Sequence, residues 1–283
     1  MSNVIIAGKY RLLKKIGAGS FGKIFSAEDI TQHKETTNTN TNTNTKTYAV
    51  KVTGVTHAPI LANEVAIYEK IREIKNIPLL HDSGVEGKIN YIVMELLDQS
   101  LEEFRSNYGD RLNINVVLHL SRQMLTIVEQ IHAYGIIHRD LKPSNFLLKT
   151  NTVGISELYL IDFGLAKSFL DEKARHYPIK TNETIVGTPR YMSLNMHHGL
   201  TASRRDDLES LGYIMLFLYH GSLVWQNQKA VSDSVNIKQK LDWTMNTVGE
   251  FVLFILYCRN LGFADKPNYT YLHNMLSNLS NSL

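Results

Sequence analysis

The segment from His138 to Asn145 reads His-Arg-Asp-Leu-Lys-Pro-Ser-Asn and places three chemically active side chains in one short loop. Asp140 can accept the proton of a hydroxyl group, Lys142 can neutralise charge on a migrating phosphoryl group, and Asn145 can bind Mg²⁺. The alternative interpretation is a polar turn between two apolar runs. Motifs elsewhere in the chain decide between the two.

A second carboxylate follows an apolar run. Asp162-Phe163-Gly164 comes directly after Leu158 to Ile161, a run that predicts a strand. A strand would carry Asp162 to a turn where its carboxylate can bind a metal ion together with Asn145. Alone this triplet would be a weak signal, but after the loop at Asp140 it favours a phosphoryl-transfer site.

Three glycines, Gly17, Gly19 and Gly22, follow a strand-like run that ends at Ile16. Without a Cβ in the way, their backbone N–H groups can approach phosphate oxygens. The same spacing occurs in dinucleotide-binding proteins, where a helix begins at the third glycine. Here the residues after Gly22 read as another strand, which favours a glycine-rich hairpin over ATP, with Ile16 and Ile24 beside the nucleotide.

Lys51 lies in the strand-like run Tyr48 to Val52 and is a candidate ligand of the α and β phosphates, although an exposed strand lysine is the alternative. The choice depends on an acidic partner. The run Leu61 to Ile71 has helical periodicity and offers Glu64 and Glu69. These two point in different directions from a helix, so only one can face Lys51, and we predict Glu64.

These motifs together resemble the eukaryotic protein kinases, and further segments resemble the casein kinase 1 family among them. Ser193-Leu194-Asn195 stands where most protein kinases have Ala-Pro-Glu and where this family has a Ser-Ile-Asn-like triplet. The segments that carry the family resemblance are Gly187 to Asn195, Ser203 to Tyr213, Gly221 to Gln226 and Lys266 to Leu272.

The resemblance implies an α+β fold with two lobes and one protein kinase domain over residues 9–280. Residues 1–95 would form a β-rich N-lobe and residues 96–283 a helical C-lobe, with ATP bound in the cleft. The Asn/Thr repeat at 36–47 has no apolar residue to bury, which predicts a flexible surface insertion. A docking or phosphoacceptor loop is the alternative for this repeat.

The resemblance also implies roles for residues outside the motifs above. Ala49 would contact the nucleotide, Met94 would be the gatekeeper beside the adenine, and backbone groups from Glu95 to Leu97 would hydrogen-bond the base. Asp207 would begin a buried helix and brace the backbone of the catalytic loop. A carboxylate at that position also suits the helix dipole, and the two roles are compatible.

A substrate site follows from the same resemblance. The casein kinase 1 family draws a basic pocket for a substrate phosphate from the positions of Arg190 and Lys229, and Gly221 would add a backbone N–H. The resemblance therefore implies a Ser/Thr kinase that prefers acidic or phosphate-primed substrates. Solvated surface charges are the alternative, because Val224 and Pro189 differ from the family's usual Pro and Ala nearby. Activity is expected without phosphorylation of the activation segment and without removal of an inhibitory tail.

Two other classes of function were weighed against a protein kinase. A pseudokinase scaffold would be expected to lack Lys51, Asp140, Asn145 or Asp162, and all of them are present. A small-molecule phosphotransferase would not be expected to carry the segment Gly187 to Asn195, which resembles a platform for peptide substrates. We therefore predict a protein kinase that uses ATP and Mg²⁺.

The composition is compatible with this prediction. The 283 residues are 43% hydrophobic, which is enough for a large core. The single cysteine, Cys258, excludes an intrachain disulfide and lies in an apolar run that predicts burial. No signal sequence, bilayer-length apolar run or zinc-ligand pattern is present. From these absences we expect a cytoplasmic protein that binds no membrane, with a nuclear fraction left open. The net charge of only +3 gives no reason to expect a specific nucleic-acid partner. We expect a monomer that binds protein substrates.

Overall fold

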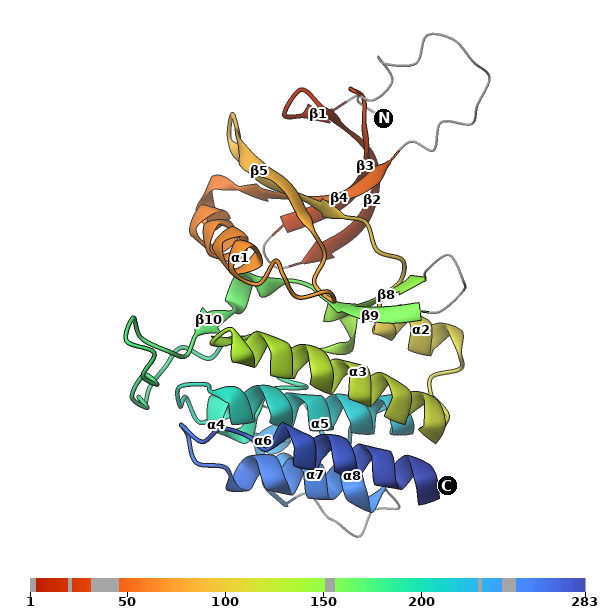
Figure 1. Cartoon of the computed structure of the whole chain (residues 1–283), viewed down its shortest axis with the longest axis vertical. Helices are drawn as coiled ribbons and strands as arrows, with labels where there is room; N and C mark the ends of the chain where they lie inside the picture. The colour runs from red at the N-terminus through yellow and green to blue at the C-terminus, as the bar shows by residue number, and fades with distance from the viewer. Residues whose placement is uncertain are drawn as a thin grey trace. The chain divides into compact units, whose positions relative to one another are not determined.

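The computed structural model describes residues 4–19, 22–31, 46–150, 156–228, 231–240 and 248–282. The chain divides into two compact units, Met1–Asp98 and Gln99–Leu283. The first is built on a β-sheet and the second mainly on helices (Figure 1), so the expected α+β fold is confirmed. Of the insertion at 36–47, only Lys46 and Thr47 are among the described residues, and Thr47 is the first residue of a strand.

The first unit contains a six-stranded sheet in which every neighbouring pair is antiparallel, in the order β1-β2-β3-β4-β6-β5. The elements are β1 (Ile5–Ile6), β2 (Tyr10–Gly19), β3 (Gly22–Asp29), β4 (Thr47–Gly54), the 3-10 helix η2 (Val55–His57), α1 (Ala58–Lys70), β5 (Leu80–Glu86) and β6 (Ile89–Glu95).

The two faces of this sheet carry different kinds of residues. Tyr48 and Val50 on β4 and Val93 on β6 belong to a buried apolar cluster on one face. Because successive side chains of a strand point to opposite faces, Ala49 and Lys51 lie on the other face. The alternation along β4 thus separates the core from candidate nucleotide-binding residues.

Helix α1 begins at Ala58, earlier than the Leu61 at which the apolar periodicity predicts it. The cause is Pro59 in the first turn, where a helix tolerates a residue without an N–H. The helix buries Leu61, Glu64 and Ile67. A buried carboxylate such as that of Glu64 is unusual and needs a partner of opposite charge.

The second unit consists mostly of helices. Its elements are α2 (Leu101–Asn107), α3 (Ile114–Ala133), β7 (Ile136–Ile137), η3 (Pro143–Asn145), β8 (Phe146–Thr150), β9 (Ser156–Leu160), η4 (Phe163–Leu165), β10 (Lys167–Ser168), α4 (Leu194–His197), α5 (Arg204–His220), α6 (Val231–Lys240), α7 (Gly249–Asn260) and α8 (Tyr269–Ser282).

Helix α5 is the centre of this unit. Every residue from Asp206 to Leu218 is buried, and α3 and α7 pack against the helix (Figure 1). It starts at Arg204, ahead of the Asp207 that was expected to begin it, because Ser203 forms a capping box in which its N–H donates to the Asp206 carboxylate at 2.7 Å. Cys258 on α7 is fully buried, as predicted.

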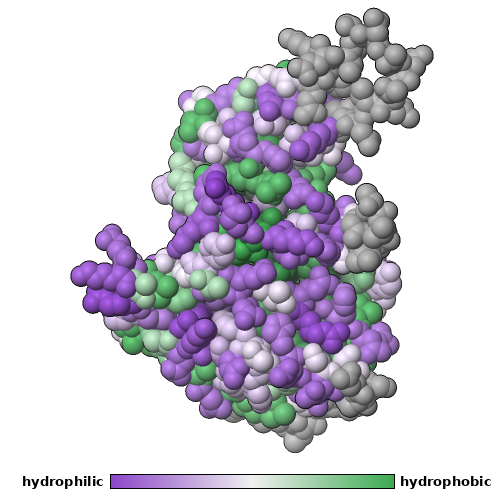
Figure 2. Space-filling model, in the orientation of Figure 1, coloured by the Kyte–Doolittle hydropathy of each residue, from purple (hydrophilic) through white to green (hydrophobic). Residues whose placement is uncertain are grey.

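The face of the molecule in Figure 2 is mostly hydrophilic, with scattered hydrophobic areas. This agrees with the burial of many apolar side chains of the sheet and of α3, α5 and α7. Within the described ranges, none of the helices combines the length and apolar character needed to cross a bilayer.

Candidate active site

In the first unit, sheet register aligns four of the predicted nucleotide-binding residues. Ile24 on β3 pairs with Lys51 on β4, and Ala49 pairs with Met94 on β6. Directly paired residues share a face, as do residues two apart on one strand. Ile24, Ala49, Lys51 and Met94 therefore lie on one face of the sheet.

The partner of Lys51 is Glu64. The Lys51 Nζ atom lies 2.7 Å from Glu64 Oε2, and both side chains are less than a tenth exposed. The rival residue, Glu69, is 57% exposed and faces Arg72 instead. Because a buried ion pair needs close geometry to offset desolvation, this contact fixes the position of the ammonium group.

The glycine-rich segment is a β-hairpin, with Gly17 paired to Ile24 and Gly19 paired to Gly22. Since a strand and not a helix begins at Gly22, the dinucleotide-binding interpretation is excluded. Gly22 also has a structural reason to be glycine, because a Cβ there would come within 2.5 Å of Val52 O. Ile16, before the hairpin, is 46% exposed. The tip, residues 20–21, lies outside the described residues.

The backbone N–H at the end of β6 is already hydrogen-bonded within the first unit. The Glu95 N–H donates to Leu79 O at 3.0 Å, so this N–H is used within the fold and is not available to an adenine base. Leu97, the other predicted hinge residue, is 7% exposed. The expected contact with the base is therefore narrowed to other backbone groups in this stretch.

In the second unit, the Asp207 carboxylate holds the catalytic loop by its backbone. It accepts hydrogen bonds from His138 N at 2.7 Å and Arg139 N at 2.9 Å, and it lies 3.0 Å from His132 Nε2. Burial alone would raise the pKa of Asp207, but the contacts with His132 and His138 hold it below its usual value. The predicted bracing role matches this geometry.

Arg139 takes a left-handed conformation with φ of 67°, which costs a residue with a side chain about 1–3 kcal/mol. Two contacts offset that strain. Asp207 accepts from the Arg139 N–H, and Arg139 Nε donates to Leu165 O at 2.6 Å. This tight turn places Asp140 directly after the bound backbone.

The Asp140 carboxylate, 9% exposed, is fixed from two sides. Its Oδ2 lies 2.6 Å from Lys142 Nζ, and its Oδ1 accepts from Thr188 N at 2.8 Å and Thr188 Oγ1 at 2.7 Å. Gly187 permits this approach, because its φ is 99° and a Cβ would lie 2.6 Å from Arg139 O. The sequence identified Asp140 and Lys142 but gave no signal for Thr188 as their partner.

Asn145 and Asp162 flank the same end of the β8–β9 hairpin. Phe146 pairs with Leu160, and Ile161 N donates to Asn145 O at 3.0 Å. The Asn145 side-chain nitrogen donates to Asp140 O at 2.9 Å, which makes its Oδ1 the atom suited to a cation. Carboxylate and amide oxygens are Mg²⁺ ligands, so these residues fit the ion.

In the part of the chain that the structure describes, no three His, Cys, Asp or Glu side chains gather as a possible metal site.

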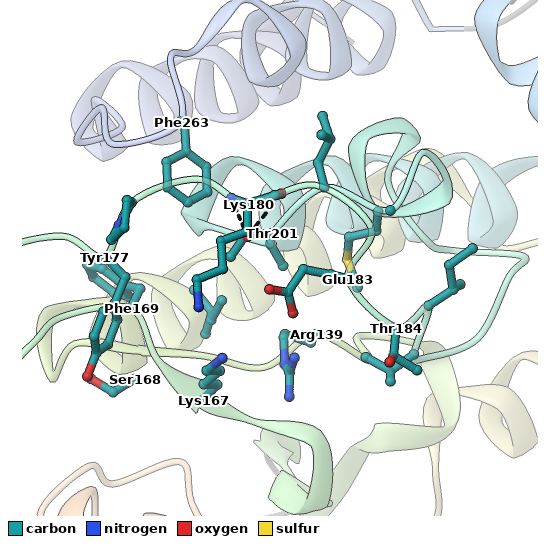
Figure 3. A pocket seen from close by; sticks show the side chains of 18 of the residues that line it. Arg139, Lys167, Ser168, Phe169, Tyr177, Lys180, Glu183, Thr184, Thr201 and Phe263 are labelled. Carbon is teal, nitrogen blue, oxygen red and sulfur yellow. Dashed lines mark hydrogen bonds between the residues drawn. The ribbon is translucent and has the colours of Figure 1, made fainter.

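A cavity of about 300 Å³ adjoins the catalytic loop. Figure 3 shows Arg139, Lys167, Lys180 and Glu183 around this space. Burial lowers the pKa of Arg139, and the charges of Asp207 and Glu183 oppose the shift. The activation segment thus contributes its own carboxylate to a cationic pocket.

The activation segment is tied to α5 at the Ser193-Leu194-Asn195 triplet. Ser193 Oγ donates to Asp206 Oδ1 at 2.7 Å, and Asn195 Nδ2 donates to the same oxygen at 3.2 Å. Despite these bonds, burial raises the pKa of Asp206 to about 6. Two of the four sequence segments that carry the family resemblance, Gly187 to Asn195 and Ser203 to Tyr213, are therefore in direct contact.

The predicted substrate-phosphate residues are placed unequally. The Arg190 guanidinium lies over the rings of Tyr191 and Phe217. The Gly221 N–H donates to Phe217 O at 2.8 Å and closes α5, so we withdraw Gly221 as a phosphate donor. Lys229 lies outside the described residues.

Comparison with known families agrees with this geometry. A model of the protein kinase domain matches residues 10–261, most of the chain. Protein kinases transfer a phosphoryl group from ATP with the help of Mg²⁺, which is the chemistry that the loop at Asp140 and the end of the β8–β9 hairpin can support. The chain belongs to the protein kinase family.

Proposed function

We propose that this kinase is a member of the casein kinase 1 family that phosphorylates Ser or Thr in acidic or phosphate-primed proteins. The observation that carries the proposal is the contact of Ser193 and Asn195 with Asp206. A glutamate in place of Asn195, as in Ala-Pro-Glu, would bring a second carboxylate towards Asp206, whereas the amide donates to it. The contact gives a physical reason for the two segments to occur together.

Phosphoryl transfer is proposed to depend on Asp140 and Lys142. Asp140 would orient the acceptor hydroxyl and take its proton, and Lys142 would stabilise charge on the transferring group. The bonds of Asp140 to Lys142 and Thr188 hold its carboxylate in one orientation before a substrate binds. Such preorganisation is a main source of catalytic power.

Each unit has its own proposed role in the binding of ATP and Mg²⁺. Lys51, oriented by Glu64, would bind the α and β phosphates, and Asn145 and Asp162 would hold Mg²⁺, which neutralises phosphate charge. The remaining proposed contacts to ATP are Ile16, Gly17, Gly19, Gly22, Ile24, Ala49, Met94 and Leu97, with the backbone of Glu95 other than its N–H.

Recognition of an acidic or phosphorylated substrate is proposed to depend on Arg190. Its guanidinium has no carboxylate in ion-pair distance among the residues that the structure describes, and it lies over two aromatic rings. Lys229 would act as a second point charge. Glu183, which already provides negative charge beside Arg139, supports activity without a phosphorylated activation segment.

The proposed setting of the enzyme is the cytoplasm, with the nucleus left open, where it acts as a monomer on protein substrates. A small net charge of +3 gives no electrostatic reason to expect nucleic acid as the partner.

The test compares a Ser peptide that has phosphoserine three positions earlier with its unphosphorylated twin. We expect the wild type to prefer the primed peptide in kcat/KM, and Arg190→Ala with Lys229→Ala to lose about ten- to a hundredfold of that preference for each residue removed, because charge-assisted bonds contribute about 1.5–3 kcal/mol each. Arg72→Ala, at an exposed arginine of the first unit, is the matched control.

Equal kcat/KM values for the two peptides on the wild type would overturn the proposed preference. A double variant with an undiminished preference would remove Arg190 and Lys229 from the site. Replacing the acceptor Ser by Thr and by Tyr in the same peptide tests the specificity for Ser and Thr.

A further inference from the structure

A buried lysine on α6 is bonded to the activation segment. Lys238 has no exposed surface, and its Nζ donates to Pro189 O at 2.8 Å and to Met192 O at 2.8 Å. It also lies 3.0 Å from His197 Nε2 on α4. A buried charged group is costly unless it is fully hydrogen-bonded, so these acceptors explain why the lysine can be there.

Aromatic rings complete the surroundings of this ammonium group. The Lys238 Nζ atom lies 5.0 Å from the centre of the Tyr213 ring and 5.4 Å from that of Trp225. Trp225 also donates from Nε1 to Arg190 O at 2.7 Å. The carbonyls of Pro189, Arg190 and Met192 are thus all held by Lys238 or by the ring beside it.

The backbone carbonyl of Lys238 is in turn hydrogen-bonded to α7. Lys238 O accepts from Arg259 Nη2 at 2.9 Å, and Arg259 Nε lies 3.0 Å from Glu209 Oε1. Helices α5, α6 and α7 therefore form one polar network that ends on the backbone of the activation segment. Partly buried charge networks of this type hold a single geometry, because each member loses its partners when the backbone shifts.

We propose that Lys238 is a positioning residue for protein substrates, which fixes the course of residues 189–192 and through them the place of Arg190. This inference rests on the proposed function, because it takes Arg190 as part of the substrate platform. None of the residues assigned to ATP contacts Lys238 in the bonds above. The lysine should therefore affect the binding of the protein substrate and not that of ATP.

The test replaces Lys238 by methionine, which fills similar space but donates no hydrogen bond. At pH 6, where Lys238 is protonated, we expect Lys238→Met to raise the KM for phosphorylated casein about tenfold or more, since a charge-assisted hydrogen bond corresponds to about a ten- to hundredfold change. The KM for ATP should change less than about twofold. Lys266→Met, at an exposed lysine before α8, is the matched control and should leave both values unchanged.

A second variant keeps the test decisive if Lys238→Met does not fold. Trp225→Phe retains a ring but removes the Nε1 donor to Arg190 O, and we expect it to raise the KM for casein by about three- to tenfold, the effect of one neutral hydrogen bond. An unchanged KM for casein in a folded variant of either kind would overturn the proposal. Equal losses for casein and ATP would also overturn it, since they indicate general damage to the fold.

Binding of casein without ATP separates this inference from the proposed function. The dissociation constant, measured by fluorescence anisotropy, depends on the platform and not on phosphoryl transfer. A wild type that binds casein but transfers no phosphate would reject the proposed function, and the Lys238→Met comparison of dissociation constants would still decide the role of the lysine.

Discussion

The two units position their candidate site residues in different ways. In the first unit, strand register aligns Ile24 with Lys51 and Ala49 with Met94, and one ion pair to Glu64 completes the arrangement. In the second unit, the site residues lie in loops, and their positions depend on bonds from distant segments. A regular sheet positions side chains by local geometry, whereas loops need a tertiary network.

The loop network has several supports, each bound to backbone as well as to side chains. Asp207 holds the N–H groups before Asp140, and Thr188 holds the Asp140 carboxylate. Removing one support should therefore affect both folding and catalysis. A change in the sheet face of the first unit should affect nucleotide binding more than stability.

The largest expected effect in this comparison is at the carboxylate that the loop network positions. Asp140→Asn should lower kcat for casein by about a hundred- to ten-thousandfold, because the amide cannot act as a general base. The protein should stay folded, since the amide oxygen can still accept from Thr188. The measurement is steady-state kinetics with thermal unfolding of the same samples.

Asp233→Asn, at an exposed position on α6, is the matched control for this change. Turnover near the wild-type value in Asp140→Asn would show that the catalytic assignment is wrong.

Lys51→Arg should also lose most activity, because the larger guanidinium group cannot take the place of the ammonium group beside Glu64.

The difference between the units also explains what the sequence could predict. The alternation along Tyr48 to Val52 sets the face on which Lys51 lies, and helical periodicity selects Glu64 as its partner, so these contacts follow from local rules. Thr188 is 48 residues from Asp140, and no local pattern indicates that they meet. Only the tertiary structure brings these two residues together.

The sequence also does not show which backbone N–H groups are already hydrogen-bonded within the fold. The resemblance implied a free N–H at Gly221, but this N–H closes α5 by donating to Phe217 O. Whether an N–H is free depends on the geometry of the neighbouring chain, which residue types do not reveal.

The next largest effect is expected at the support of the catalytic loop. Asp207→Ala should lower the free energy of unfolding by about 3–5 kcal/mol, because the buried N–H groups of His138 and Arg139 lose their acceptor. Chemical denaturation measures this loss.

In the first unit, Glu64→Gln keeps an acceptor near Lys51 and should mainly raise the KM for ATP.

The outcome that would contradict the comparison is a similar loss of stability in Asp207→Ala and Glu64→Gln. Asp233→Ala serves as the control, because it removes an exposed carboxylate from α6 and should leave the unfolding free energy within about 0.5 kcal/mol of the wild type.

The smallest expected effect is a pH dependence of stability from the buried lysine of the second unit. Burial lowers the pKa of Lys238 from 10.5 to about 7, with Glu209 opposing the shift and Arg259 adding to it. Burial also lowers the pKa of its neighbour His197, to about 4, so this histidine does not titrate above pH 7. The pKa of Tyr213, whose ring faces the lysine, is raised well above its usual value, so Tyr213 does not titrate below pH 10.

Between about pH 7 and 10.5, the unfolded chain therefore binds a proton at Lys238 that the folded chain does not bind. The free energy of unfolding should rise with pH in this window, by up to about 1.4 kcal/mol per pH unit from this residue. Lys238→Met removes that contribution, so its unfolding free energy, measured in urea from pH 7.5 to 9.5, should have a smaller slope against pH than the wild type. Because the other titrating groups are common to both proteins, their contributions cancel in the difference between slopes. Equal slopes would show that Lys238 keeps its proton in the folded protein over this range and that its bonds to the activation segment are those of a charged ammonium group throughout.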